Sequence, residues 1–268
     1  MTDHNHNQGA VQDELHSASL IHGGERIDDL QLKGLKILQK RASFRFGTDA
    51  VLLADFAAPK SKDKVVDLGT GTGVLCLLMA GHVDGAQFDA VEIQEDMADM
   101  ARRSVEINGL QNRIRVHHMD MREAPKALGC GKTSLVVCNP PYSPAGTSLV
   151  SDSAGERISR HAEDIDIEDI CRAGAALLKN GGRFALVYPA PRMLQLMTAL
   201  RACHMEPKRV RIVMDKPGAV PKIVLVDAVK LGGEMLHWLP PLILKDEHGE
   251  YTDEWRRIYR QERGEDPC

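Results

Sequence analysis

A glycine-rich turn has the residue types needed to hold a ligand close to bare main chain. An apolar segment, 64–68, leads into this turn, which reads Asp67-Leu68-Gly69-Thr70-Gly71-Thr72-Gly73. Glycines at alternating positions let the backbone turn sharply and admit a ligand. The spacing differs from the G-x-G-x-x-G of dinucleotide-binding folds, and the charge of Asp67 would repel a pyrophosphate but attract an α-ammonium group. The turn therefore favours S-adenosylmethionine, which has an ammonium group and no phosphate.

Two more carboxylates stand at the ends of the next two apolar segments. Glu92 ends the first, roughly 20 residues beyond the glycine turn, where a carboxylate can accept two hydrogen bonds from ribose hydroxyls. Asp120 follows the second, where it could accept a hydrogen bond from an adenine amino group while Met121 packs on the ring. A solvated strand end for Glu92 and a helix cap for Asp120 are the alternative interpretations.

The segment Asn139-Pro140-Pro141-Tyr142 has the residue types needed to present a planar nitrogen to a methyl donor. The lone pair of an aromatic amine or an amide is delocalised, so such a nitrogen is a poor nucleophile. The Asn139 side-chain oxygen and the Pro140 carbonyl could accept its N–H groups and help localise the lone pair. Prolines stiffen the turn, and Tyr142 offers a ring for stacking, worth ~1–3 kcal/mol for a nucleobase. Because orientation is then the main catalytic contribution, no strong base is required.

The elements that must position these groups alternate along the chain. Apolar runs predict strands, and amphipathic runs with caps or stops predict helices. The predicted strands are 64–68, 88–93, 114–119, 134–138, 183–188, 208–214 and 223–230, and short extended pieces precede them at 35–39 and 43–46. The predicted helices are 48–56, 74–82, 94–107, 164–178 (ended by Asn180-Gly181-Gly182) and 191–203.

This alternation predicts an α/β fold with a doubly wound, seven-stranded, mostly parallel sheet. A Pro/Gly-rich turn without a crossover helix joins the last two strands, so they must form one antiparallel edge hairpin. In such sheets ligands bind beyond the carboxyl ends of the strands. The residues singled out above stand at or just after strand ends, which is where that rule places a site.

Composition favours a reduced, cytoplasmic protein with no membrane segment and no metal site. The chain has 268 residues, of which 43% are hydrophobic, and its longest apolar run, around 75–80, is too short to cross a bilayer. The N-terminal residues lack the apolar core of a secretory signal and predict a disordered tail over 1–19. The six cysteines form no Cys-x-x-Cys pair, which argues against a zinc or disulfide framework.

The formal net charge of −4 argues against a protein that is basic over its whole surface. Two segments are nevertheless basic: 31–45 has five basic residues and no acid, and 192–230 has eight basic residues and three acids, a charge of +5 in each. Nucleic-acid binding needs only a local basic face. Charge alone leaves an RNA-binding face and ordinary solvated faces equally open.

The glycine turn and the Asn-Pro-Pro-Tyr segment, in this order, resemble the class I, N-methylating methyltransferases. Other segments resemble one bacterial family more narrowly, the tRNA(Val) adenine-N6 methyltransferases, which modify the adenine beside the anticodon. These segments are 24–30, 44–50, Arg160-His161, 240–242 and 249–252. The resemblance spans about residues 20–260. It implies a Rossmann-like class I fold, S-adenosylmethionine as cofactor and tRNA as substrate.

The resemblance also implies roles for individual residues and segments. Cofactor contacts fall on Gly69, Gly71, Gly73, Glu92 and Asp120, and acceptor-base contacts fall on Asn139 and Tyr142. Thr48 or its neighbours would close over the cofactor, and the stretch 143–161 is either a substrate lid or a plain loop. Along the chain, residues 20–60 are expected to form an N-terminal extension that packs on a catalytic domain over 61–268.

Three other functions compete with tRNA adenine methylation. A release-factor glutamine-N5 methyltransferase would use the same Asn-Pro-Pro-Tyr chemistry but would carry an N-terminal helical domain, for which only about 45 residues precede the predicted helix at Thr48. A ribosomal RNA guanine-N2 methyltransferase would more often have Phe after the prolines. A catalytically inactive RNA-binding module is disfavoured because every motif residue is intact.

Overall fold

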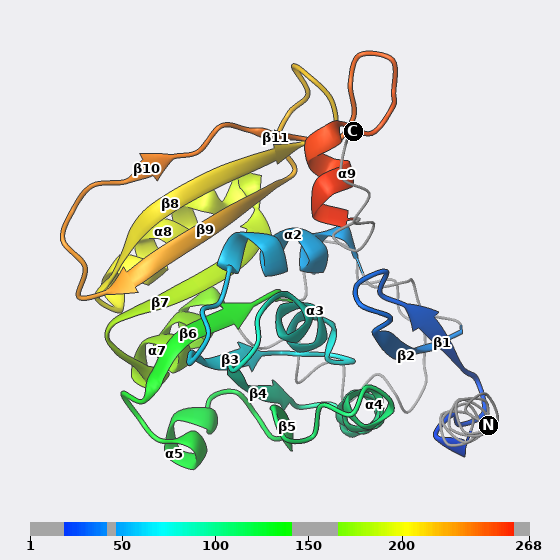
Figure 1. Cartoon of the computed structure of the whole chain (residues 1–268). Helices are drawn as coiled ribbons and strands as arrows, with labels where there is room; N and C mark the ends of the chain where they lie inside the picture. Colours follow the sequence, from blue (N-terminus) through cyan, green and yellow to red (C-terminus); the bar gives the residue numbers. More distant parts are fainter. Residues whose placement is uncertain (1–18, 42–46, 141–165, 260–268) are drawn as a thin grey trace, which may run out of the picture.

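The centre of the molecule is a nine-stranded sheet with helices on both faces (Figure 1). The computed structural model describes residues 19–41, 47–140 and 166–259. Seven of the strands follow one another across the sheet in the order β5-β4-β3-β6-β7-β9-β8. Their bounds are Lys64–Leu68 for β3, Gln87–Glu92 for β4, Ile114–His118 for β5, Thr133–Cys138 for β6, Leu178–Pro189 for β7, Met205–Met214 for β8 and Ile223–Lys230 for β9.

The pairing confirms the predicted doubly wound, mostly parallel sheet. Strands β3 to β7 pair in parallel, and β9 runs antiparallel between β7 and β8. The arrows of β8 and β9 accordingly point in opposite directions in Figure 1. The sequence did not predict β10 (His237–Trp238) and β11 (Leu242–Ile243), which both pair with β8 and raise the number of strands from seven to nine.

One predicted helix boundary is wrong. The helix expected to end at Asn180-Gly181-Gly182 is α7, Ile167–Leu177, and those three residues already belong to β7. The strand begins early because Leu178 pairs with Thr133 of β6, with a register shift before the pairing of Arg183 with Leu135. The predicted extended piece 43–46 lies outside the described residues.

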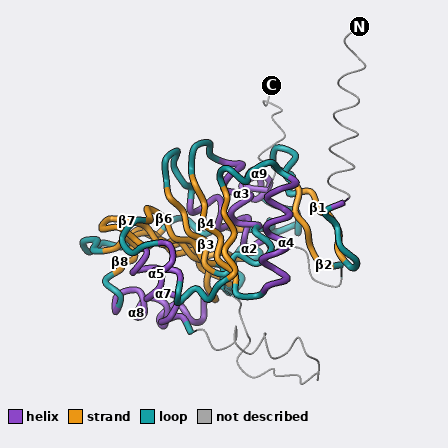
Figure 2. The backbone as a smooth tube through the Cα atoms, turned by 90° about the horizontal axis from the view of Figure 1, so that it is seen from below, coloured by secondary structure: helices purple, strands orange, loops and turns teal. Residues whose placement is uncertain are grey.

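Each face of the sheet has its own apolar core. Helices α2, α3, α4 and α9 contribute to the first core, and α5, α7 and α8 contribute to the second. Figure 2 shows α5, α7 and α8 gathered on one side of the strands. The bounds are Thr48–Ala57 for α2, Val74–His82 for α3, Glu95–Ile107 for α4, Ala124–Leu128 for α5, Met193–Ala202 for α8 and Asp253–Tyr259 for α9.

An N-terminal hairpin of β1 (Glu25–Asp29) and β2 (Lys36–Lys40) forms a separate antiparallel sheet beside α4 (Figure 2). Backbone groups of β2 bond to side chains of α4: the Leu38 N–H donates to Ser104 Oγ over 2.9 Å. The hairpin thus packs on the main sheet's helix layer, and its Leu30, Leu32 and Ile37 belong to the first core together with residues of α2, which follows it. The boundary predicted at residue 60 stays a prediction.

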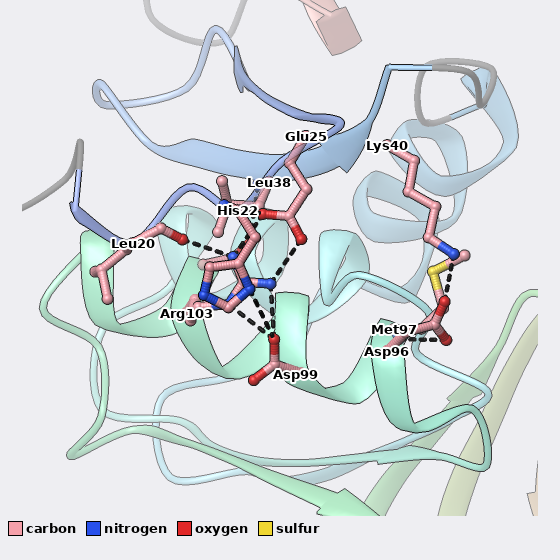
Figure 3. A network of polar contacts seen from close by, with 10 residues as sticks. Leu20, His22, Glu25, Leu38, Lys40, Asp96, Met97, Asp99 and Arg103 are labelled. Carbon is pink, nitrogen blue, oxygen red and sulfur yellow. Dashed lines mark hydrogen bonds and ion pairs between the residues drawn. The ribbon is translucent and has the colours of Figure 1, made fainter.

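A buried ion pair fastens the hairpin to α4 (Figure 3). Both terminal nitrogens of Arg103 donate to the Glu25 carboxylate over 2.7 Å, and the two side chains are only 9% and 11% exposed. Arg103 also donates to Asp99 and to the Leu20 carbonyl. The pKa of Glu25 lies below its usual value, mainly because Arg103 hydrogen-bonds its charged form. All of these bonds would be lost together if Arg103 were removed.

Replacing Arg103 with Leu is expected to lower the free energy of unfolding by about 3–5 kcal/mol, because it leaves the Glu25 carboxylate buried without its cation. The Asp96→Asn variant is the control, because it breaks the more exposed Lys40–Asp96 pair on the same helix and should cost about 1 kcal/mol or less. Urea unfolding measures both. Equal losses in the two variants would contradict the role assigned to the buried pair.

Candidate active site

The predicted functional residues converge where β3, β4 and β6 end. These strands are parallel neighbours, so their carboxyl ends meet at one edge of the sheet. A cavity of about 200 Å³ opens there. Six residues singled out from the sequence line it: Gly69, Gly71, Glu92, Met121, Asn139 and Pro140. Residues of the glycine turn and of the Asn-Pro segment, about 70 positions apart in the chain, therefore face one space.

The glycine turn folds around the end of β4. The N–H groups of Gly69 and Thr70 both donate to the Val91 carbonyl over 2.9 Å. Gly69 and Gly71 have positive φ angles of 77° and 58°, which L side chains adopt rarely. Bare main chain thus forms one wall of the cavity, as the sequence predicts. Thr70, Thr72 and Gly73 belong to the turn but do not line the cavity.

Asp67 is fully buried behind the turn and does not reach the cavity wall. Its Oδ2 atom accepts a hydrogen bond from the Thr70 hydroxyl over 2.6 Å and a weak one from the Cys76 thiol over 3.7 Å. Its Oδ1 atom is buried without a hydrogen-bond partner among the described residues, and an unpaired buried acceptor is uncommon. Burial raises the pKa of Asp67 to about 7. Any effect of its charge on a cationic ligand therefore reaches the cavity from behind the turn.

Glu92 is buried at the end of β4, with 5% of its surface exposed. Its Oε2 atom accepts the Gly71 N–H over 2.8 Å and its Oε1 atom accepts the Gln94 N–H over 2.9 Å. Burial raises the pKa of Glu92. Because each carboxylate oxygen has two lone pairs, both can still accept a ligand hydroxyl. The buried, oriented carboxylate excludes the alternative of a solvated strand end.

Replacing Glu92 with Gln is expected to weaken binding of S-adenosylmethionine about tenfold or more. The amide has one acceptor oxygen where the carboxylate has two, so a ribose hydroxyl loses its charged acceptor, at a cost of about 1.5–3 kcal/mol. Glu95→Gln is the matched control, because Glu95 is exposed in the first turn of α4. Calorimetric titration of each variant with the cofactor and with S-adenosylhomocysteine gives its affinity for each of the two ligands. Equal affinities in the two variants would contradict the ribose-binding role of Glu92.

Asp120 lies between two methionines that line the cavity, Met119 and Met121. Its Oδ1 atom accepts the Arg122 N–H over 2.8 Å, and its carboxylate also pairs with the Arg122 guanidinium. Burial acts to raise the pKa of Asp120, but the Arg122 hydrogen bonds outweigh it and lower that pKa. The N-cap of α5 itself is Glu123, but the bond from the Arg122 N–H to Asp120 caps the turn that leads into this helix, so the helix-cap alternative stays open. The proposed bond of Asp120 to adenine stays a prediction.

Asn139 and Pro140 begin the segment after β6. Pro140 is buried and Asn139 is half-buried at the cavity wall. The Cys138 thiol, one residue earlier, donates to the Leu68 carbonyl over 3.1 Å and ties β6 to β3 beneath the site. Tyr142 and the candidate lid 143–161 lie outside the described residues. Thr48 begins α2 and does not line the cavity.

Sequence reasoning missed several residues of the cavity wall. Val91, Ile93, Gln94 and Met119 flank residues that the sequence did single out, so their places along the strands could have identified them. Ile170 comes from α7, and no local pattern links that helix to the glycine turn. It adds an apolar side chain to the wall from the second helix layer.

The described residues contain no group of three or more His, Cys, Asp or Glu side chains placed to hold a metal ion. Their helices include none that is long and apolar enough to cross a membrane.

Comparison with known proteins identifies the family. The sequence model of the "Methyltransferase small domain" family matches residues 42–209, more than half of the chain. A protein of Tolumonas auensis named tRNA1(Val) (adenine(37)-N6)-methyltransferase is 31% identical over 197 residues, which are 72% of this chain and 80% of the relative. A relative of the same name from Bacteroides thetaiotaomicron is 30% identical over 73% of this chain and 81% of its own length.

A solved structure described as a predicted O-methyltransferase of Agrobacterium tumefaciens has the same fold, with a TM-score of 0.66. It is 23% identical and covers 80% of this chain and 97% of its own. At that identity the likeness concerns the fold alone. The family match, the two relatives and the cavity between glycine turn and Asn-Pro segment agree, and the chain belongs to the methyltransferase small domain family and, more narrowly, to the tRNA1(Val) (adenine(37)-N6)-methyltransferase family.

Proposed function

We propose that the protein transfers the methyl group of S-adenosylmethionine to the exocyclic N6 of an adenine in tRNA, next to the anticodon, in the cytoplasm. The observation that carries the proposal is the shared cavity: Asn139 and Pro140 line the same space as Gly69, Gly71 and Glu92. A methyl donor held by the second group would therefore meet an acceptor held by the first. The relatives' names state this activity for those proteins.

The wall of the cavity suits the parts of the cofactor. Glu92 keeps lone pairs for the ribose hydroxyls, and the bare main chain of Gly69 and Gly71 admits close approach. Met119 and Met121 offer apolar, polarisable contacts for adenine. Asp67, buried behind the turn, would in its charged form attract the ammonium end. When bound, S-adenosylmethionine supplies the electrophilic methyl group.

The acceptor side orients the nitrogen. The Asn139 carboxamide oxygen and the Pro140 carbonyl accept the two N–H groups of the adenine amino group and turn its lone pair toward the methyl group. Tyr142 stacks on the base. The chain needs no strong base there, because the methylated nitrogen is acidic and releases its proton to water. Catalysis by these residues is therefore mainly orientation and hydrogen bonding, which together can be worth several powers of ten in rate.

Methylation of purified substrates tests the proposal. The protein is incubated with labelled S-adenosylmethionine and, in parallel, with tRNA, ribosomal RNA and release factor from a strain lacking the gene. We expect label in N6-methyladenosine of one tRNA, and we expect that nucleoside to be missing from the strain's tRNA by mass spectrometry. Label in glutamine or in N2-methylguanosine would replace the proposal by one of its rivals, and absence of any turnover would leave only a binding role.

A further inference from the structure

We propose that one exposed surface beside the cavity binds the RNA phosphates that flank the target base. We name it the basic ledge and define it by Arg192 in the short helix η1 (Ala190–Arg192) and by Lys216 and Lys222 in the turn between β8 and β9. All three residues are exposed. The inference rests on the proposed function, because it names how the RNA is held, and it adds a site that the family motifs do not contain.

The structure divides the basic segment 192–230 into two groups. Five of its eight cations are occupied within the protein. Arg209 pairs with Asp227, Arg211 with Glu254 and Arg201 with Glu206, whereas Lys208 and Lys230 donate to backbone carbonyls. These five cations therefore stabilise the fold, and the net charge of +5 of the segment is not the charge of a single surface.

The other three cations form the basic ledge. Arg192 has a neutral neighbour, Tyr188, within hydrogen-bonding reach. Lys216 and Lys222 make no ion pair with any residue that the structure describes. Nearby acids are Asp215, directly before Lys216, and Glu168, which acts on Tyr188 from α7. Asp246 is also close, because it follows Lys245, whose N–H donates to the Asp215 carbonyl. Within η1 and the turn, three cations face one acid.

The fold places the basic ledge on the same edge of the sheet as the cavity. Cys138 of β6 is level with Leu186 of β7, so Asn139 lies beside the last residues of β7, and η1 follows them directly. The Ala190 N–H donates to the Lys222 carbonyl over 2.9 Å, which joins η1 to the turn. From β6 to β8 there are three strand spacings, or about 14 Å. A base held at Asn139 would therefore have its neighbouring nucleotides over the basic ledge.

Two exposed apolar side chains strengthen this assignment. Leu194 is 78% exposed and Val220 is 81% exposed, one beside each half of the basic ledge. Basic groups next to exposed apolar side chains suit single-stranded RNA, whose phosphates and unstacked bases are both accessible. An anticodon loop presents both features.

The other basic segment, 31–45, does not form a comparable surface among the described residues. Lys40 pairs with Asp96, and the Arg41 side chain donates to the Glu25 carbonyl. Lys33 and Lys36 are exposed but lie at the far end of α4, because Lys36 bonds through its main chain to Asn108, the C-cap of that helix. That end faces away from the cavity, since α4 begins just after Glu92.

A triple variant, Arg192→Gln with Lys216→Gln and Lys222→Gln, tests the basic ledge. Its control carries Lys33→Gln, Lys36→Gln and Lys179→Gln, which remove three exposed cations near the opposite edge of the sheet. Binding of unmodified tRNA is followed by fluorescence anisotropy between about 50 and 200 mM salt. We expect the Kd of the triple variant to rise about tenfold or more, and its salt slope to fall by about 2, at roughly 0.7 per single-stranded phosphate contact. The control should match the wild type.

A single variant with the opposite expected effect on tRNA binding keeps the test valid if the triple variant does not fold. Asp215→Asn removes the acid beside Lys216 and should lower the Kd for tRNA about twofold to threefold. Calorimetric binding of S-adenosylmethionine checks that every variant is folded. If the wild type methylates tRNA but neither the triple variant nor Asp215→Asn changes tRNA binding relative to the control, the basic ledge is wrong and the proposed function stands. If the wild type neither binds nor methylates tRNA, the basic ledge and the proposed function are both wrong.

Discussion

The Asn139→Ala variant is expected to bind S-adenosylmethionine like the wild type and to lose methyl transfer by a factor of about 10²–10³ or more, which is the scale of removing one aligned polar group from an active site. The carboxamide oxygen is the strongest side-chain acceptor that the Asn-Pro-Pro-Tyr segment offers to an N–H of the target nitrogen. Without it the lone pair stays delocalised and the base is free to turn. Single-turnover methylation of tRNA, with cofactor affinity measured separately, gives the two quantities.

Asn180→Ala is the matched control, because Asn180 is exposed in the first residues of β7, at the opposite end of the strand from the site. It should leave turnover and cofactor affinity at wild-type values. Equal turnover for Asn139→Ala and this control would refute the acceptor role. A loss of cofactor affinity in Asn139→Ala as large as its loss of rate would instead make Asn139 part of the donor pocket.

Strands of the central sheet were predictable because they are buried on both faces. The segment 223–230 is mainly apolar and β-branched, and 64–68 has three apolar residues beside Lys64 and the buried Asp67. Both strands have the predicted bounds. The hairpin strand β1 was missed, since its sequence, Glu-Arg-Ile-Asp-Asp, carries no apolar pattern. Its Glu25 is buried by pairing with Arg103, which lies 78 positions further along the chain. A local pattern cannot reveal a partner at that distance.

The site shows the same division between local and distant information. The glycine turn and Glu92 follow a rule about strand ends, so the sequence could predict their place, and Gly69, Gly71 and Glu92 do line the cavity. Asp67 belongs to the same motif, yet the structure buries it behind the turn. How deeply Asp67 is buried depends on how closely Gly69 and Thr70 fold against the Val91 carbonyl. Val91 belongs to the neighbouring strand β4, so the sequence of the turn alone does not show this. Likewise, the three cations of the basic ledge can be told apart from the other five only when the ion pairs and hydrogen bonds among the described residues are known.

Replacing Asp67 with Asn is expected to destabilise the protein at low pH and to stabilise it at high pH. The pKa of Asp67 is raised by burial from its ordinary value of 3.8 to about 7. Between these values the folded protein binds a proton that the unfolded chain has released, so the contribution of Asp67 to stability falls as pH rises from about 4 to about 7. Above pH 7 the wild type holds a buried charge, which costs a few kcal/mol at about 1.4 kcal/mol for each unit of pKa shift.

The amide of the variant carries no charge at any pH. Its Oδ1 can accept the Thr70 hydroxyl, but its N–H groups face the place where Asp67 Oδ1 has no partner among the described residues, at a cost of about 1–3 kcal/mol. At about pH 5 burying the neutral wild-type carboxyl costs less free energy than burying the amide, so the variant should unfold at the lower temperature. At about pH 8 the order of the two unfolding temperatures should reverse. Thermal unfolding of both proteins without ligand across this range measures the crossing, and Glu92, whose pKa is also raised, is present in both.

The titration of Asp67 should also affect cofactor binding. A cationic ligand near Asp67 favours its charged form, so binding of S-adenosylmethionine to the wild type should strengthen as pH rises toward about 7, by up to about tenfold per pH unit. The neutral amide of the Asp67→Asn variant offers no such charge, so the affinity of the variant should be lower at about pH 8 and nearly independent of pH. Parallel pH profiles of cofactor affinity in the two proteins would show that Asp67 does not act on the ammonium group. If Asp67 does act on the ammonium group, the variant that is more stable at high pH should bind the cofactor less well. The buried charge of Asp67 destabilises the free protein, and a cation close to it offsets that destabilisation in the complex.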